Sequence, residues 1–202
     1  MLVAENLTSQ EAILDACDAL MVRYGFRKMS MDDVAKKAGV SRRTIYNLFR
    51  SKEDLGLSSI GRVVSQVFAE MEEIAGSGAP SAERLQACLH QRVLGRLRRV
   101  RDYASSLDEL FEAVRPAYLA RRREMFERES ALLRRILAEG IESGEFRPGT
   151  TGFADSMILA TNAFIPYSLS PAELGDEIEV VARLDRMTEL LISSVAKTAS
   201  ED

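Results

Sequence analysis

The sequence lacks most of the residues on which enzymatic chemistry and metal binding commonly depend. It has one histidine, two cysteines and no tryptophan among 202 residues. Cys17 and Cys88 lie far apart and lack the spacing of metal ligands, so we expect no metal site and no cofactor. The motifs GxGxxG, GxxxxGK[ST], GxSxG and HExxH are absent. Because a single histidine leaves few routes to acid–base catalysis, the sequence argues against an enzyme.

Long apolar runs are also missing. No segment approaches the roughly 20 apolar residues that a membrane-spanning helix needs. The first residues, Met-Leu-Val-Ala-Glu-Asn, have neither a basic stretch nor a long apolar one, so no signal peptide is expected. Cys17 falls on an apolar helical stripe and is interpreted as a core residue with a reduced thiol. We therefore expect a cytoplasmic protein with no membrane contact.

Charge is unevenly distributed along the chain, whose formal net charge is −4. Judged by net charge alone, an acidic protein is a poor ligand for nucleic acid. Residues 22–52, however, contain nine basic side chains and only two acidic ones, Asp32 and Asp33. Such a basic segment in an acidic chain indicates a local site for phosphate groups, although chance clustering on a solvated surface gives the same pattern.

Apolar residues recur with a helical period along almost the whole chain, and no segment shows a convincing strand alternation. Helix ends are set by caps and breakers, among them Thr8 with Glu11 at capping-box spacing, Pro116, and Ser170 before the last helix. The sequence therefore predicts an all-α protein with about nine helices. We expect these at about 9–24, 31–38, 42–49, 51–75, 81–101, 104–113, 117–143, 152–165 and 171–197.

Residues 31–50 meet the narrow demands of a helix-turn-helix, in which two short helices cross at a steep angle. Ala35 supplies a small side chain where the backbones approach, and Gly39 supplies a turn residue that tolerates positive φ. Ser41 is a good N-cap for the second helix. An ordinary helical hairpin has some of these features, but rarely all of them in register. Apolar residues fall where the helices would touch: Val34, Ala38, Val40, Ile45 and Leu48.

The wider segment 13–55 resembles the N-terminal domain of the TetR family of bacterial transcriptional regulators, over about a quarter of the chain. This sequence departs from the family's pattern at Arg42 and Arg43, where relatives usually have smaller residues, and at Asn47, often aromatic or His. These differences concern which DNA sequence is read. The matching positions are Gly25-Phe26, Ser30, Ala38-Gly39-Val40-Ser41, Thr44-Ile45-Tyr46, Phe49 and Ser51-Lys52-Glu53-Asp54-Leu55.

The resemblance implies two domains. Residues 1–52 would form a helix-turn-helix DNA-binding domain, and residues 53–202 a helical domain that binds an effector and dimerises. The second helix of the helix-turn-helix would enter the major groove, and Thr44 and Tyr46 would contact phosphates. The expected DNA-binding residues are Ser30, Ser41, Arg42, Arg43, Thr44, Tyr46, Asn47 and Lys52.

Residue type assigns further roles within this set. Arg42 and Arg43 are candidates for reading guanine, because a guanidinium matches O6 and N7, although both could bind phosphate alone. Asn47 could read adenine or could be solvated. Lys52 lies at the amino end of a helix, where a cation and the helix dipole together suit a phosphate, and Ser30 could act in the same way.

The resemblance also implies that the last two helices form a four-helix bundle with a second copy. Residues 153–165 are nearly apolar all round, which favours burial against a partner. A large core within one chain is the alternative. The expected interface residues are Phe153, Met157, Ala160, Phe164, Leu184, Met187, Leu191 and Val195.

The middle helices, about 54–145, surround the effector pocket in this family. Arg92, Arg96 and Arg99 share one helix face there and could bind an anionic ligand. The stronger expectation is a solvated face paired with nearby acids. Large apolar residues could line the pocket, although at helical spacing they are also ordinary core: Phe68, Met71, Tyr103, Phe111, Tyr118, Met125 and Phe126.

The sequence thus predicts a regulator of transcription, a repressor as most often in this family. Its homodimer would bind double-stranded DNA at a near-palindromic operator and be released by an unknown small-molecule effector. A helical protein-interaction module with a vestigial DNA-binding fold is the main alternative. That module would show no DNA affinity, or an affinity that does not depend on Arg42, Arg43 and Lys52.

Overall fold

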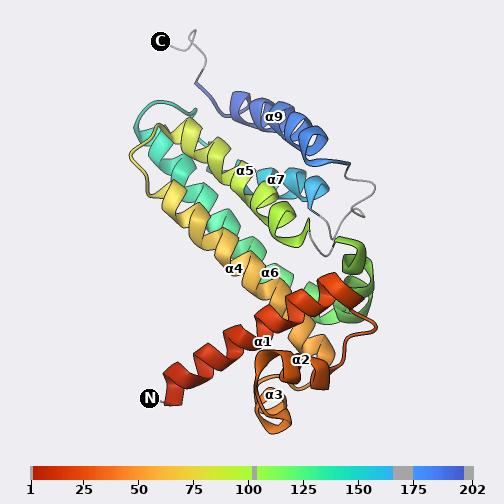
Figure 1. Cartoon of the computed structure of the whole chain (residues 1–202). Helices are drawn as coiled ribbons and strands as arrows, with labels where there is room; N and C mark the ends of the chain where they lie inside the picture. Colours follow the sequence, from red (N-terminus) through yellow and green to blue (C-terminus); the bar gives the residue numbers. More distant parts are fainter. Residues whose placement is uncertain (1, 102–103, 166–174, 198–202) are drawn as a thin grey trace. The chain divides into compact units, whose positions relative to one another are not determined.

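A computed structural model describes residues 2–101, 104–165 and 175–197 (Figure 1). The all-α prediction is confirmed: these ranges contain eight α-helices, close to the predicted nine, and an isolated β-bridge between Phe146 and Ala196. Among the described helices, none is both long and apolar enough to cross a membrane. The helices are α1 (Leu2–Tyr24), α2 (Met31–Ala38), α3 (Arg42–Leu48), α4 (Lys52–Ala75), α5 (Ser81–Val100), α6 (Ala104–Glu142), α7 (Phe153–Thr161) and α9 (Glu177–Ser193).

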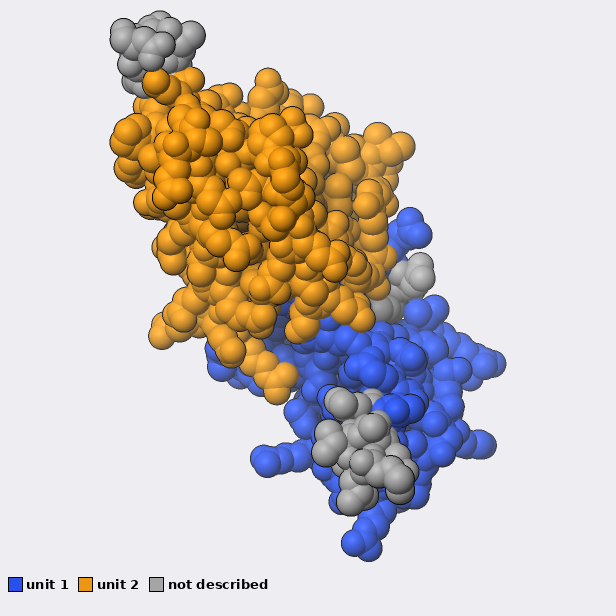
Figure 2. Space-filling model, turned by 90° about the vertical axis from the view of Figure 1, so that its left-hand side faces the viewer, with its two compact units in different colours: residues 1–64, 100–120 blue, residues 65–99, 121–202 orange. Residues whose placement is uncertain are grey.

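The chain divides into two compact units, coloured separately in Figure 2. The first unit consists of residues 1–64 and 100–120, and the second of residues 65–99 and 121–202. Helices α4 and α6 each contribute residues to both units. The predicted division of the chain into a DNA-binding part, residues 1–52, and an effector-binding part, residues 53–202, concerns function and stays a prediction.

The core of the first unit is built around one face of α1. Ile13, Cys17 and Met21 on this helix are fully buried, together with Val34 of α2 and Ile45 of α3. Fully burying an apolar side chain of this size contributes roughly 1.5–3 kcal/mol. Burial raises the pKa of the Cys17 thiol to about 12, so the thiol stays protonated and unreactive. The prediction that Cys17 is a core residue is confirmed.

A polar contact fastens α1 to α4 within the same unit. The Arg62 side chain, 13% exposed, forms ion pairs with Glu11 at 2.9 Å, Asp15 at 2.7 Å and Asp18 at 2.6 Å. The Ser59 hydroxyl donates a hydrogen bond to the Asp18 carboxylate at 2.5 Å. Three carboxylates of α1 contact one guanidinium of α4. Because such contacts are directional, they fix the orientation of α4 against α1 in addition to apolar packing.

The turn between α2 and α3 forms as the sequence predicts. Gly39 has φ 70° and ψ 24°, the left-handed region that glycine enters without steric cost. The Ser30 side chain accepts a hydrogen bond from the Asp33 backbone N–H, and the Asp33 carboxylate accepts one from the Ser30 N–H, which completes a capping box for α2. The Ser41 hydroxyl caps α3 by accepting from the Thr44 N–H at 3.0 Å.

Several predicted helix limits differ from the structure, among them the ends of the last two helices, which stop at Thr161 and Ser193 instead of near 165 and 197. Helix α1 begins at Leu2, so Thr8 is not its cap. The predicted break at Pro116 is wrong, because α6 is continuous from Ala104 to Glu142. Pro116 is exposed, and burial of residues on both sides, such as Val114 and Leu132, outweighs the backbone hydrogen bond that a proline removes. Helix α9 begins at Glu177 after an Asp176 cap, and the predicted cap at Ser170 lies outside the described residues.

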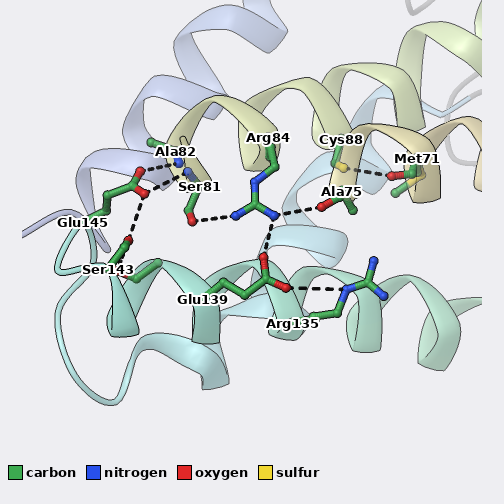
Figure 3. A network of polar contacts seen from close by, with 11 residues as sticks. Met71, Ala75, Ser81, Ala82, Arg84, Cys88, Arg135, Glu139, Ser143 and Glu145 are labelled. Atoms are coloured by element: carbon green, nitrogen blue, oxygen red, sulfur yellow. Dashed lines mark hydrogen bonds and ion pairs between the residues drawn. The ribbon is translucent and has the colours of Figure 1, made fainter. Parts of the chain in front are cut away.

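A network of polar contacts joins three helix ends in the second unit (Figure 3). The Glu145 carboxylate accepts hydrogen bonds from the backbone N–H groups of Ser81 and Ala82, both at 3.0 Å. Burial opposes ionisation of Glu145, but these hydrogen bonds outweigh it and hold its pKa below the ordinary value. The Arg84 Nη1 donates to the carbonyl of Ala75 at the end of α4, at 2.8 Å. The ends of α4 and α6 are thereby fixed against the start of α5.

A buried ionic cluster lies deeper in the second unit. Arg92 donates from Nε to Glu129 at 2.8 Å, from Nη1 to the Thr161 hydroxyl at 2.9 Å and from Nη2 to the Asn162 side-chain oxygen at 2.7 Å. Arg96 also pairs with Glu129. Side-chain exposure is only 4% for Arg92, 9% for Arg96 and 2% for Glu129. The cluster joins α5 and α6 to residues 161 and 162.

The structure confirms that these arginines pair with acids, but it corrects the prediction that they form a solvated face. Arg92 and Arg96 do pair with an acid, but they do not form the predicted solvated face, because Glu129 and the polar groups of Thr161 and Asn162 satisfy them in the interior. Arg99 is less buried and pairs with Glu70 at 2.5 Å. The three arginines therefore share a helix face but differ in environment.

Replacing the buried carboxylate tests how much the cluster stabilises the fold. We expect Glu129→Gln to lower the free energy of unfolding at pH 7 by about 3 kcal/mol, since it leaves two buried guanidinium groups without a counter-charge. Urea unfolding measures the change. Glu127→Gln, at an exposed position of the same helix, is the control and should change it by less than about 0.5 kcal/mol.

Comparing the stability of wild type and Glu129→Gln at different pH values tests the charge state of Glu129. Burial opposes ionisation of Glu129, but the charges of Arg96 and Arg92 outweigh it and lower its pKa below the ordinary 4.5. A folded-state pKa below the unfolded one stabilises the fold above pH 4.5 and loses this effect as the pH falls through the folded-state pKa. The stability gap between wild type and Glu129→Gln should narrow in acid; a constant gap would contradict this assignment.

The turn glycine provides a test of the helix-turn-helix geometry. We expect Gly39→Ala to reduce the free energy of unfolding by about 1–2 kcal/mol, because its positive φ is strained for a residue with a Cβ. Gly61→Ala is the matched control: Gly61 lies within α4 with open space around the added Cβ, so stability should rise by about 0.4–1 kcal/mol. Thermal or urea unfolding distinguishes the two signs, and equal effects would contradict the strain argument.

Candidate nucleic-acid interface

Helix α3 has one buried side and one exposed side. Ile45 is fully buried, and Phe49, directly after the helix, is 2% exposed. Leu48 is half-buried against the same core. Ile45 and Leu48 were predicted to lie where the helices touch, and the structure agrees. The opposite side presents Arg42, Arg43, Tyr46 and Asn47, all of which are exposed.

The two predicted serines are occupied within the helix-turn-helix. The Ser30 hydroxyl donates to the Asp33 carboxylate at 2.5 Å. The Ser41 and Thr44 hydroxyls share a hydrogen bond of 2.8 Å. All three hydroxyl groups therefore hold the ends of α2 and α3. A contact from any of them to a ligand would have to be made in addition to, or in exchange for, these bonds.

Arg42 is held by two neighbours. Its Nη1 donates to the Asp32 carboxylate of α2 at 3.0 Å. Its guanidinium carbon also lies 5.6 Å from the centre of the Tyr46 ring, within cation–π range. The role of Asp32 was missed at the sequence level. The signal available there was weak: an acidic residue inside a basic segment, on the helix that precedes Arg42.

Lys52 has a more internal position than predicted. Its Nζ donates to the backbone carbonyls of Phe26 and Arg27, both at 3.2 Å, and lies 4.9 Å from the centre of the Phe26 ring. An ammonium group has three N–H donors, so these carbonyls take two of them. Lys52 thus fixes the segment after α1, and a phosphate contact could use only what remains of its donor capacity.

The basic segment 22–52 keeps most of its charge on the surface. The two acids within it are both engaged, Asp33 in the cap of α2 and Asp32 with Arg42. Exposed cations, together with the polar side chains on the exposed side of α3, suit a polyanion, with phosphates bound by charge and base edges by hydrogen bonds. The exposed cations are Arg23, Arg27, Lys28, Lys36, Lys37, Arg42, Arg43 and Arg50.

The predicted effector residues do not form one group. Phe68 and Met71 are buried in the core of the second unit, and Met125 and Phe126 pack against that core while partly exposed. Phe111 and Tyr118 instead pack against the core of the first unit, where their rings meet edge to face with centroids 5.3 Å apart. The seventh predicted residue, Tyr103, lies outside the described residues.

The predicted dimer residues are divided between core and surface. Met157, Leu184 and Val195 are fully buried and Phe164 is 8% exposed, so these four side chains already belong to the chain's own core. Phe153 is 42% exposed. Ala160, Met187 and Leu191 are intermediate. On α7 and α9, three large apolar side chains that were not predicted are more exposed than Phe153: Leu159 at 57%, Leu190 at 67% and Ile178 at 80%.

Known proteins share both the motif and the fold. Residues 13–57 match the family model described as bacterial regulatory proteins of the tetR family. The fatty acid metabolism regulator protein of Bacillus subtilis (strain 168) is 28% identical over 195 residues, which are 91% of this chain and 93% of that protein.

Two solved structures have the same fold. A transcriptional regulator of the TetR/AcrR family from Thermobifida fusca has a TM-score of 0.68 and 25% identity, covering 91% of this chain and 96% of the other. FadR from Bacillus subtilis, solved with stearoyl-CoA, has a TM-score of 0.63 and 23% identity, covering 91% and 97%. The matched motif coincides with the helix-turn-helix, and the likeness in fold extends over nearly the whole chain. Residues 13–57 therefore carry the DNA-binding motif of the TetR family, and the chain is a DNA-binding transcriptional regulator, not an enzyme.

Proposed function

We propose that this protein is a transcriptional repressor whose homodimer binds a near-palindromic operator and is released by a small-molecule effector. One observation carries the DNA-binding part of the proposal: α3 is locked into the core on one side and presents arginine, tyrosine and asparagine on the other. The major groove alone is wide enough for such a helix and displays a full donor and acceptor pattern. We infer a cytoplasmic location, because bacterial DNA lies in the cytoplasm.

We assign the α3 side chains by their chemistry. Arg42 and Arg43 read base edges, since guanidinium groups match guanine O6 and N7. Asn47 is suited to adenine, which offers one donor and one acceptor side by side. Tyr46 and Thr44 contact phosphates, together with Ser41 at the start of α3 and with Ser30 and Lys52 at the starts of α2 and α4. Lys52 contributes mainly by its charge, because backbone carbonyls already accept two of its hydrogen bonds.

The dimer interface lies on α7 and α9, which pack against each other. Phe153 and Leu159 on α7, and Ile178 and Leu190 on α9, are large apolar side chains with at least two-fifths of their surface exposed. Covering them with the same residues of a second copy gives the self-complementary contact of a two-fold dimer. Two recognition helices about 34–36 Å apart can then enter successive major grooves on one side of the duplex.

The effector proposed here is a compound with a long acyl chain. Two observations on similar proteins support it: one relative is named as a fatty acid metabolism regulator, and FadR was solved with stearoyl-CoA. The second unit of this chain offers a suitable apolar environment in the cluster that includes Phe68, Met71, Met125 and Phe126. Phe111 and Tyr118 pack against the other core and are less suited to the same ligand.

The protein would be released from DNA if the effector binds one of its conformations more tightly than the other. An effector shifts the balance between two conformations only by its preference for one of them, typically about 1–3 kcal/mol. Helices α4 and α6 contribute to both units, so either can carry a displacement from the effector side to the helix-turn-helix.

Arg43 provides the test of DNA recognition. With duplexes selected from fragmented genomic DNA, we expect salt-sensitive binding by the wild type and a loss of about 1–3 kcal/mol for Arg43→Ala on the selected sequence. Fluorescence anisotropy across a salt series measures both. Arg123→Ala, an exposed arginine of the second unit, is the control and should leave affinity unchanged. Wild-type protein that binds no duplex, or equal binding by both variants, would contradict this assignment of α3.

The dimer is tested by charge insertion. We expect the wild type to sediment as a dimer, and Ile178→Glu with Leu190→Glu to sediment as a monomer with unchanged helix content, because buried unpaired carboxylates are costly. Leu119→Glu, which changes a side chain that is 50% exposed on α6 of the first unit, is the matched control and should remain dimeric. A double variant that stays dimeric would place the interface elsewhere.

A further inference from the structure

Asp32 is an acidic residue in the middle of the basic segment, where its charge opposes phosphate binding. The other acid of that segment, Asp33, has a local role in the capping box of α2. Asp32 follows the same cap but points its carboxylate to Arg42 on the next helix, with 3.0 Å between Oδ2 and Nη1. The pair bridges the two helices of the helix-turn-helix. A residue that weakens attraction to DNA therefore contacts a side chain proposed to read DNA.

The geometry of the Arg42 guanidinium leaves one useful edge open. Asp32 accepts from Nη1, and the Tyr46 ring, 5.6 Å from Cζ, lies within cation–π range. In the part of the chain that the structure describes, the hydrogen bonds of Arg42 involve Nη1 alone. The edge formed by Nε and Nη2 carries two N–H groups side by side. Such a pair of donors matches the two acceptors O6 and N7 of guanine.

We propose that Asp32 is a positioning residue, which orients Arg42 so that its Nε–Nη2 edge reads a guanine; the inference rests on the proposed function. An unrestrained arginine loses much of its rotamer freedom when it binds, and an arginine already held loses less. Without Asp32, Arg42 is free to turn to phosphates, which are present at every position and carry no sequence information. Asp32 thus lowers the affinity for DNA of any sequence and raises the preference for guanine over other bases.

The test compares base preference with overall affinity. Wild type, Asp32→Asn and Arg42→Ala are each used to select duplexes from a randomised pool, and binding is then measured by anisotropy. Arg42→Ala identifies the base pair that Arg42 reads. At that base pair we expect Asp32→Asn to reduce discrimination roughly two- to five-fold, the range of an exposed ion pair. Its affinity for random-sequence duplex should rise, because one negative charge is removed.

Two controls separate positioning from general charge and from folding. Glu53→Gln removes one charge from the start of α4, where the carboxylate interacts with Ser51 and with its own backbone, and should change random-sequence affinity but not base preference. In an Arg42→Ala background, Asp32→Asn should leave base preference unaltered, because its effect passes through Arg42. Thermal unfolding checks that each variant is folded at the assay temperature.

Three results would overturn the proposal. Asp32→Asn could leave base preference unchanged, it could alter preference equally with and without Arg42, or Arg42→Ala could leave every preference intact. In each case the protein still binds DNA and only the role of Asp32 is rejected. Failure of the wild type to show salt-dependent binding to any duplex is a separate result, which rejects the proposed function itself.

Discussion

The exposed side of α3 depends on the burial of its other side. A helix of seven residues is not stable alone in water, because nucleation costs more than its few hydrogen bonds return. Burial of Ile45 and Phe49 and the Ser41 cap make it persist. Since successive side chains are set at fixed angles around a helix, fixing Ile45 also fixes where Arg42 and Tyr46 point. The direction in which the exposed side chains of α3 point is therefore a consequence of core packing.

Features that depend on near neighbours could be predicted from the sequence, and features that depend on distant ones could not. The capping residues and Gly39 act within a few positions, so the limits of α2 and α3 followed from local rules. The break expected at Pro116 was wrong because a proline's cost is local, whereas the continuity of α6 is decided by burial on both sides. The burial of Arg92 likewise depends on Glu129, 37 positions away.

The candidate sites show the same limit. A stripe of apolar residues indicates that a helix face is covered, but not by which chain. Leu184 and Val195 were predicted to meet a partner, yet they are fully buried in the chain's own core, while Leu190 is 67% exposed. Lys52 was predicted to bind phosphate because it lies at the start of a helix. The carbonyl groups that accept its hydrogen bonds, however, belong to residues 25 and 26 positions earlier. Such partners follow from tertiary packing, which periodicity does not contain.

Directional contacts on α4 explain how the proposed release could be discrete rather than gradual. In the first unit, Arg62 of α4 is held by three carboxylates of α1. In the second unit, Glu70 of the same helix pairs with Arg99 and accepts from Gln91. Ion pairs and hydrogen bonds weaken steeply when their geometry is lost, so a shifted α4 must exchange whole sets of partners. In the proposed mechanism, contacts of this kind at two places would favour two distinct positions of α4 over a continuum, and an effector would need to favour only one of them.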